Sequence, residues 1–142
     1  MQIRNAKASW EGTLKEGNGS MSFTDYEGAY TFASRFENGE GTNPEELVGA
    51  AHAGCYSMFL SALITNEGLI PKRVETQAVV SIGKDETGPC ITSIKLDCTA
   101  ICEGLSQEKF EELSVIAKAK CPISRLYSGG TAEIELNATL LS

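Results

Sequence analysis

The chain has 142 residues, of which 42% are hydrophobic and 22% are charged, and its formal net charge at pH 7 is −7. This composition is typical of a soluble globular protein, and the length suits a single domain, which we place at residues 1–142. Nucleic-acid binding requires a basic surface that displaces counterions, and Lys and Arg form no cluster here, so we expect no nucleic-acid partner.

The N-terminus and the cysteines indicate the cellular compartment, and one apolar run raises the question of a membrane-spanning helix. The first residues lack the apolar core of a signal peptide, and the five cysteines are an odd number. We therefore expect a cytoplasmic protein with reduced thiols. The uncharged run 47–66 is long enough to span a membrane, but it contains a histidine, several hydroxyl groups and no aromatic belt. We interpret it as a buried central helix, with no membrane partner.

The first 36 residues predict β structure. Four short strands are expected, at 3–10, 13–16, 21–24 and 29–36. Turns are expected at Glu11-Gly12 and at 17–19, and a glycine-containing loop at 38–41 leads to the next element.

A long helix is predicted to begin at Pro44 and to run to about Glu67. Asn43 can cap it, and proline suits its first position because the missing N–H would be unpaired there. Glu45 complements the positive end of the helix dipole, and a glycine after Glu67 provides the stop.

The rest of the chain alternates strands with helices. Five elements are expected: strands at 74–82 and 94–102, a helix capped by Ser106, a short helix at 122–127 and a last strand at 133–140. This order predicts an α+β fold in which antiparallel strands curve against helices. A helix that is apolar on all sides needs more cover than one subunit of this size supplies, so we expect a homodimer with a shared core.

Three of the cysteines have an ordinary structural interpretation. Cys98 and Cys102 share one face of a predicted strand and lie about 13 Å apart along it, which is too far for a disulfide. We interpret both as small buried apolar residues, and Cys90 as an incidental turn residue. With one histidine and no Cys-x-x-Cys or His-x-x-x-His spacing, neither a metal site nor a cofactor is expected.

Cys55 lies in the predicted long helix, and by itself it would be taken for a core residue. The small residues around it leave room for a substrate or a partner helix, and His52 lies on the same helical side. Apolar surroundings raise the pKa of a thiol unless a cation is near. His52 could supply that charge but suits a hydrogen-bonded core residue better, so Arg35 is the better candidate.

Cys121 directly precedes Pro122, which places it at the start of the short helix, where the helix dipole favours a thiolate. The residue pattern allows either Cys55 or Cys121 to be the primary nucleophile, and spacing does not decide between them.

The string Thr-Asn-Pro-Glu-Glu-Leu-x-Gly-Ala-Ala-His-Ala-x-Cys at 42–55, with a later Cys-Pro before a short helix, resembles the osmotically inducible protein C / organic hydroperoxide resistance (OsmC/Ohr) family. The resemblance covers nearly the whole chain. Ala51-His52-Ala53 and Arg35-Phe36-Glu37 favour the OsmC branch. The family resemblance implies an OsmC-like fold, with curved sheets around a central helix in an intertwined homodimer. The resemblance also implies a thiol-dependent peroxidase that reduces organic hydroperoxides and, more weakly, hydrogen peroxide.

The resemblance further assigns roles. Cys55 would be the peroxidatic cysteine and Cys121 the resolving one, while Arg35 and Glu45 would form the charged pair that orients and activates the thiolate. An external dithiol, of lipoyl type, would reduce the resulting disulfide. The alternative function is a non-enzymatic, stress-related redox sensor or a protein that binds a small apolar ligand.

One geometric expectation does not depend on the family. Glu45 and Cys55 are ten residues apart, which is about 15 Å along a helix. A continuous helix cannot bring both to one arginine. Either the helix breaks, or Glu45 serves the site of a partner subunit, and we expect the second.

Overall fold

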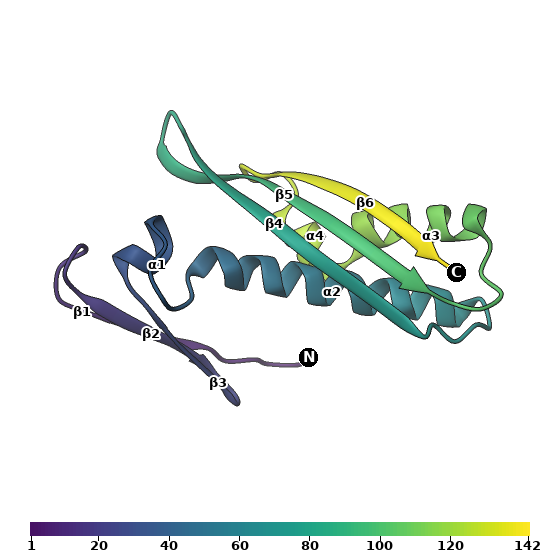
Figure 1. Ribbon diagram of the computed structural model, residues 1–142, viewed down its shortest axis with the longest axis horizontal. Helices are drawn as coiled ribbons and strands as arrows, with labels where there is room; N and C mark the ends of the chain where they lie inside the picture. Colours follow the sequence, from purple (N-terminus) through teal and green to yellow (C-terminus); the bar gives the residue numbers. More distant parts are fainter. The chain divides into compact units, whose positions relative to one another are not determined.

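The computed structural model describes residues 1–142 (Figure 1), and the chain divides into two compact units, Met1–Leu47 and Val48–Ser142. Its elements are six strands and four helices, and the strands form two three-stranded sheets. The α+β fold expected from the order of elements is confirmed. The two units are described in turn.

The N-terminal unit holds an antiparallel meander of β1 (Lys7–Glu11), β2 (Asn18–Phe23) and β3 (Tyr26–Tyr30). Two predictions were wrong here. The segment 13–16, expected as a strand, is a turn in which the Gly17 N–H donates to the Thr13 carbonyl at 2.8 Å. The expected turn at 17–19 instead opens β2, because the chain already turns at Gly12, whose positive φ of 90° favours glycine.

The strand expected at 29–36 was also wrong in its second half, where α1 (Phe32–Phe36) forms. Thr31 and Ser34 form a reciprocal cap: the Ser34 N–H donates to Thr31 Oγ1 at 3.1 Å, and the Thr31 N–H donates to Ser34 Oγ at 2.8 Å. This cap satisfies backbone groups that would otherwise be unpaired at the helix start. It places Arg35 in the last turn of a short helix.

The long helix α2 (Pro44–Asn66) is as predicted. Its first turn is capped by Asn43 Oδ1, which accepts from the Glu46 N–H at 2.8 Å, and Gly68 takes a positive φ of 82° after its end. The helix is continuous over its length, which excludes the less favoured alternative of a broken helix. That Glu45 serves a partner subunit stays a prediction.

By length and composition alone, α2 is apolar enough to cross a membrane. In the structure it instead packs one face into the C-terminal unit: Tyr56, Leu60 and Ile64 are fully buried there. Ser57 Oγ also donates to Thr76 Oγ1 of β4 (Arg73–Asp85) at 2.7 Å. The opposite face is open, and Met58 is 77% exposed. The expectation of a helix buried on every side is therefore not met within one chain.

The sheet of the C-terminal unit has the order β4, β5 (Gly88–Ile101), β6 (Glu133–Leu141). β4 and β5 are antiparallel, but β6 runs parallel to β5, in contrast to the antiparallel arrangement expected. The reason is the connection: α3 (Gln107–Lys120) and α4 (Pro122–Tyr127) form a crossover that returns the chain to the end where β5 began. β5 begins at Gly88, six residues before the strand expected at 94–102, and the other expected elements of this unit are confirmed within about three residues.

The core of this unit lies where α2, α3 and β5 meet. Its largest fully buried side chains come from these three elements: Tyr56, Leu60, Ile64, Ile94, Leu96 and Phe110. A buried hydroxyl also finds a partner, because Tyr56 Oη donates to the Ser114 carbonyl of α3 at 3.3 Å. This packing fixes the angle between α2 and α3 and with it the position of the α3–α4 junction.

Candidate active site

Cys55 and Cys121 meet in the C-terminal unit. Cys55 is half-buried on α2, and Cys121 is fully buried between α3 and α4. Burial raises the pKa of Cys55, a backbone hydrogen bond with Ile123 lowers it, and a hydrogen bond and charge interaction with the Cys121 side chain raise it. Both thiols are free. The structure thus brings together the two cysteines that the sequence singled out.

The chain geometry at Cys121 holds its sulfur in place. Its backbone N–H donates to the Ala117 carbonyl at 3.0 Å and closes α3, while the residue itself is the N-cap of α4. Pro122 then occupies the first turn of α4, as predicted. The Ser124 N–H donates to Cys121 Sγ at 3.3 Å, so the thiol takes the part that a hydroxyl plays at most helix starts.

His52 is joined to Cys121 through one intermediate residue. His52 is fully buried, and its Nε2 lies 2.7 Å from Ser124 Oγ. The same Ser124 Oγ is hydrogen-bonded to Cys121 Sγ at 3.1 Å. Burial lowers the pKa of His52 below its ordinary value of 6.5. His52 is therefore neutral at pH 7 and does not supply a positive charge to Cys55, in line with its interpretation as a hydrogen-bonded core residue.

Ser124 was missed in the sequence. Its position three residues after Cys121, with a proline between them, is the spacing of an N-cap residue and the N3 backbone group that it satisfies. That spacing is the signal that could have found it. Its contact with His52 joins residues 72 apart in the chain, and no local sequence pattern predicts such a contact.

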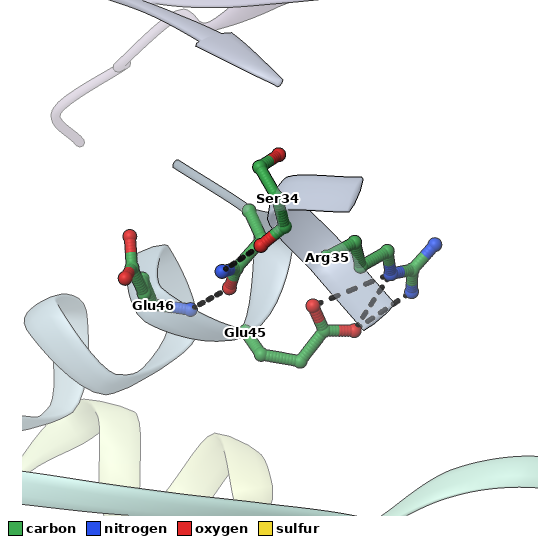
Figure 2. Close-up of polar contacts among 5 residues, drawn as sticks. Ser34, Arg35, Glu45 and Glu46 are labelled. Carbon is green, nitrogen blue, oxygen red and sulfur yellow. Dashed lines mark hydrogen bonds and ion pairs between the residues drawn. The ribbon is translucent and has the colours of Figure 1, made fainter. Parts of the chain in front are cut away.

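Arg35 and Glu45 form a two-pronged ion pair in the N-terminal unit (Figure 2). Arg35 Nε lies 3.0 and 3.3 Å from the two Glu45 carboxylate oxygens, and an Arg35 terminal nitrogen lies 2.7 Å from Oε1. The Glu45 side chain is 10% exposed, whereas the Arg35 side chain is 39% exposed. The buried carboxylate of Glu45 thus orients the guanidinium of Arg35, and part of the guanidinium remains accessible to another group.

The turn between α1 and α2 holds this pair in position (Figure 2). Asn43 Nδ2 donates to the Ser34 carbonyl at 3.1 Å. Ser34 Oγ also donates to the Thr42 carbonyl at 2.8 Å. The residue before Arg35 is therefore bonded to the turn that leads into α2, so the two charged side chains leave the backbone from a rigid base.

A cavity of about 370 Å³ opens beside Arg35 within the same unit. Most of its lining is apolar or aromatic, and Arg35 is its charged member: Trp10, Leu14, Tyr30, Phe32, Phe36 and Arg35. The guanidinium carbon of Arg35 lies 5.1 Å from the centre of the Phe36 ring. Such a cavity suits an apolar group attached to a polar one that the arginine can meet.

Two of the remaining cysteines are core residues. Cys98 is 2% exposed and Cys102 is 7% exposed, and both belong to the hydrophobic core that also contains Cys121. Burial raises the pKa of Cys98, which keeps it a neutral thiol. No group of three or more His, Cys, Asp or Glu side chains is placed to hold a metal ion.

An α+β fold that holds two reduced thiols in contact defines a small dithiol protein. The chain belongs to the OsmC-like protein family, whose model matches residues 37–137. It is 39% identical to peroxiredoxin OsmC of Escherichia coli (strain K12), over 98% of this chain and 97% of that one. It is 34% identical to organic hydroperoxide resistance protein OhrA of Bacillus subtilis (strain 168), over 62% and 61% of the two chains.

The fold gives the same result. The crystal structure of an OsmC-like protein from Mycoplasma pneumoniae superimposes with a TM-score of 0.78 over 99% of both chains, at 14% sequence identity. This superposition confirms the OsmC-like fold. The family expected from the string at 42–55 is confirmed by the family model and by the 39% identical relative.

Proposed function

We propose that this protein is a thiol-dependent peroxidase that reduces organic hydroperoxides to alcohols through Cys55 and Cys121. The observation that carries the proposal is the contact between these two thiols. The family supports it, because its named members include a peroxiredoxin and an organic hydroperoxide resistance protein. The family model spans parts of both units, and we propose that residues 1–142 act as one functional domain.

The proposed cycle begins at Cys55, which is half-buried, whereas Cys121 is fully buried and suits the second step. The Cys55 thiolate attacks the distal oxygen of the hydroperoxide, the O–O bond breaks, and the alcohol leaves after taking up a proton. Cys55 becomes a sulfenic acid. Cys121 then condenses with it to a disulfide and releases water, which protects Cys55 from further oxidation.

A cation must favour the Cys55 thiolate, because burial is the largest influence on its pKa and raises it. Arg35 is our candidate, with Glu45 as the residue that orients it. Because α2 is continuous, Glu45 lies about 15 Å along the helix from Cys55. We infer that the Arg35–Glu45 pair of one subunit serves the Cys55 of its partner in a homodimer.

The open face of α2 supports such a dimer. This face of α2 carries small or flexible exposed residues that are three or four positions apart: Ala51, Gly54, Met58 and Ala62. A second helix can approach closely over small side chains, and burying Met58 would remove a large apolar group from water.

The aromatic cavity beside Arg35 supports an organic rather than an inorganic peroxide as the preferred substrate. Its walls favour an alkyl or aryl group, while hydrogen peroxide would leave them unused and would be reduced more weakly. If Arg35 serves the partner's Cys55, this cavity accompanies it to the same site.

An external dithiol completes the cycle by thiol–disulfide exchange, and we propose a lipoyl-type dithiol acting in the cytoplasm. A dithiol is an effective reductant here because its second thiol attacks the mixed disulfide between reductant and protein in an intramolecular step. The proposed cycle uses no bound cofactor.

The test is dithiol-dependent consumption of cumene hydroperoxide by the wild type, Cys55→Ser and Cys121→Ser. We expect catalytic turnover in the wild type, none in Cys55→Ser, and oxidation that stops after about one equivalent in Cys121→Ser. Catalytic turnover that survives in Cys55→Ser contradicts the proposal. A wild type that is oxidised only stoichiometrically would instead be a redox sensor.

A further inference from the structure

We propose that His52 is a positioning residue for the second thiol: it fixes Ser124 Oγ, which holds the proton of Cys121 away from Cys55 and leaves a lone pair of Cys121 Sγ facing Cys55. The inference rests on the proposed function and concerns the step in which the disulfide forms. It starts from one unusual feature of the buried histidine, whose Nδ1 has no hydrogen-bond partner while Nε2 lies 2.7 Å from Ser124 Oγ.

The unpartnered nitrogen determines which tautomer His52 adopts. Neutral imidazole carries one proton, and placing it on Nδ1 would leave a buried N–H donor without an acceptor, which folded proteins rarely tolerate. The proton therefore lies on Nε2, where it donates to Ser124 Oγ. Burial keeps the ring neutral, because it lowers the pKa of His52.

The histidine in turn holds the serine hydroxyl oxygen in position. Because a hydroxyl oxygen has two lone pairs, Ser124 Oγ can accept the His52 proton and also the thiol hydrogen of Cys121, whose Sγ donates to it at 3.1 Å. The Ser124 N–H donates back to this sulfur, at 3.3 Å. Cys121 Sγ thus donates one hydrogen bond to Ser124 and accepts one from it, both on the α4 side.

These two hydrogen bonds leave one lone pair of Cys121 Sγ without a partner on the α4 side. It points away from α4 toward Cys55, whose thiol is the other hydrogen-bonding neighbour of Cys121. After the peroxide step, that neighbour is a sulfenic acid. Cys121 Sγ attacks the Cys55 sulfur, the S–S bond forms and the S–O bond breaks. The thiol proton joins the departing hydroxyl to make water. Cys121 is oxidised and the Cys55 sulfur is reduced, with no further reactant.

Matched substitutions separate this role from simple packing. His52→Gln retains an N–H donor near the position of Nε2, whereas His52→Leu removes it at similar volume. Ser124→Ala removes the hydroxyl but keeps the backbone donor. Ser114→Ala is the control, because it deletes a hydroxyl that is equally buried, at 2% exposed, and that donates only to the Phe110 carbonyl.

The experiment is a single turnover with one equivalent of cumene hydroperoxide, stopped at increasing times. Loss of hydroperoxide reports the first step, and loss of two alkylatable thiols reports the disulfide. In His52→Leu and Ser124→Ala we expect disulfide formation to slow by about tenfold while hydroperoxide loss stays within about twofold of the wild type. Dimedone-reactive sulfenic acid should accumulate. His52→Gln and Ser114→Ala should form the disulfide at close to the wild-type rate.

Disulfide formation at the wild-type rate in both His52→Leu and Ser124→Ala overturns the inference alone, and so does a His52→Gln variant as slow as His52→Leu. A wild type that consumes hydroperoxide without forming the Cys55–Cys121 disulfide overturns the proposed function, and this inference with it. Thermal melts of each variant identify any loss of fold, and Ser124→Ala provides the same test if His52→Leu does not fold.

Discussion

Arg35 and Glu45 form their ion pair within one chain, with 2.7 Å between the closest nitrogen and oxygen, although they belong to different helices. The pair therefore acts as a single unit. If it serves a cysteine in another subunit, both of its members must come from the same partner. This consequence allows a test that uses mixed dimers.

The first prediction is complementation between two defective variants. Glu45→Gln should lower kcat/KM for an organic hydroperoxide by about 10- to 100-fold, because it weakens a charge-assisted pair that orients Arg35. Cys55→Ser should be inactive. Refolding the two together forms heterodimers in which one site has both an intact Cys55 and an intact Glu45. Random mixing should restore about a quarter of the wild-type activity, measured as dithiol-dependent peroxide loss.

The control for complementation is a mixture of Arg35→Ala with Glu45→Gln. Because the two residues act as a pair from one chain, every site in these heterodimers lacks one of them, and activity should stay low. A mixture of Cys55→Ser and Glu45→Gln that gains nothing would show that each site is built from one chain.

The second prediction concerns Asn43, which both caps α2 and bridges to the Ser34 carbonyl. Asn43→Ala should lower the free energy of unfolding by about 1 kcal/mol and also lower peroxidase activity, because it loosens the base of the Arg35–Glu45 pair. Ser106→Ala is the matched control: Ser106 caps α3 by accepting from the Lys109 N–H at 3.2 Å. This variant should lower the free energy of unfolding, measured with urea, by a similar amount and leave kcat/KM unchanged. Equal activities for the two variants would contradict the role given to Asn43.

Much of the fold could be predicted because its signals are local. The start and end of α2 follow from Asn43, Pro44 and Gly68, each of which acts on its immediate neighbours. The helix α1 was missed because Phe32 and Phe36 suit a strand as well as a helix. Its Thr31–Ser34 cap lacks the glutamate or glutamine that normally marks such a start. The direction of β6 was missed because it depends on how two helices cross over the sheet.

The sequence pointed to the two thiols that the structure brings into contact, but not to the hydrogen bonds around them. Cys55 and Cys121 could be chosen from their local surroundings, and the family motif supplied their order. The contact of Ser124 with His52 depends on the packing of α4 against α2, which the sequence does not show. The cation expected beside Cys55 was assigned to Arg35, and the resemblance paired Arg35 with Glu45. The structure contains that ion pair.

The third prediction is that Cys98 takes no part in the redox cycle. It is 2% exposed in the core, and burial raises its pKa, so it stays a neutral and inaccessible thiol. Cys98→Ala should lower the free energy of unfolding by about 1 kcal/mol and leave peroxide turnover unchanged. Peptide mapping after one turnover should find Cys98 reduced. A loss of turnover in a variant of normal stability would contradict this assignment.

The fourth prediction uses the pH dependence of stability. His52 is the only histidine, and burial lowers its pKa below 6.5 in the folded protein, so the unfolded chain binds more protons as the pH falls through this region. The free energy of unfolding should therefore decrease as the pH falls from about 7.5 to about 5.5, by at most about 1.4 kcal/mol per pH unit. His52→Gln has no such group and should give a flatter profile. Urea unfolding at constant ionic strength measures both curves, and parallel curves for the wild type and His52→Gln would show that His52 is not held neutral by burial.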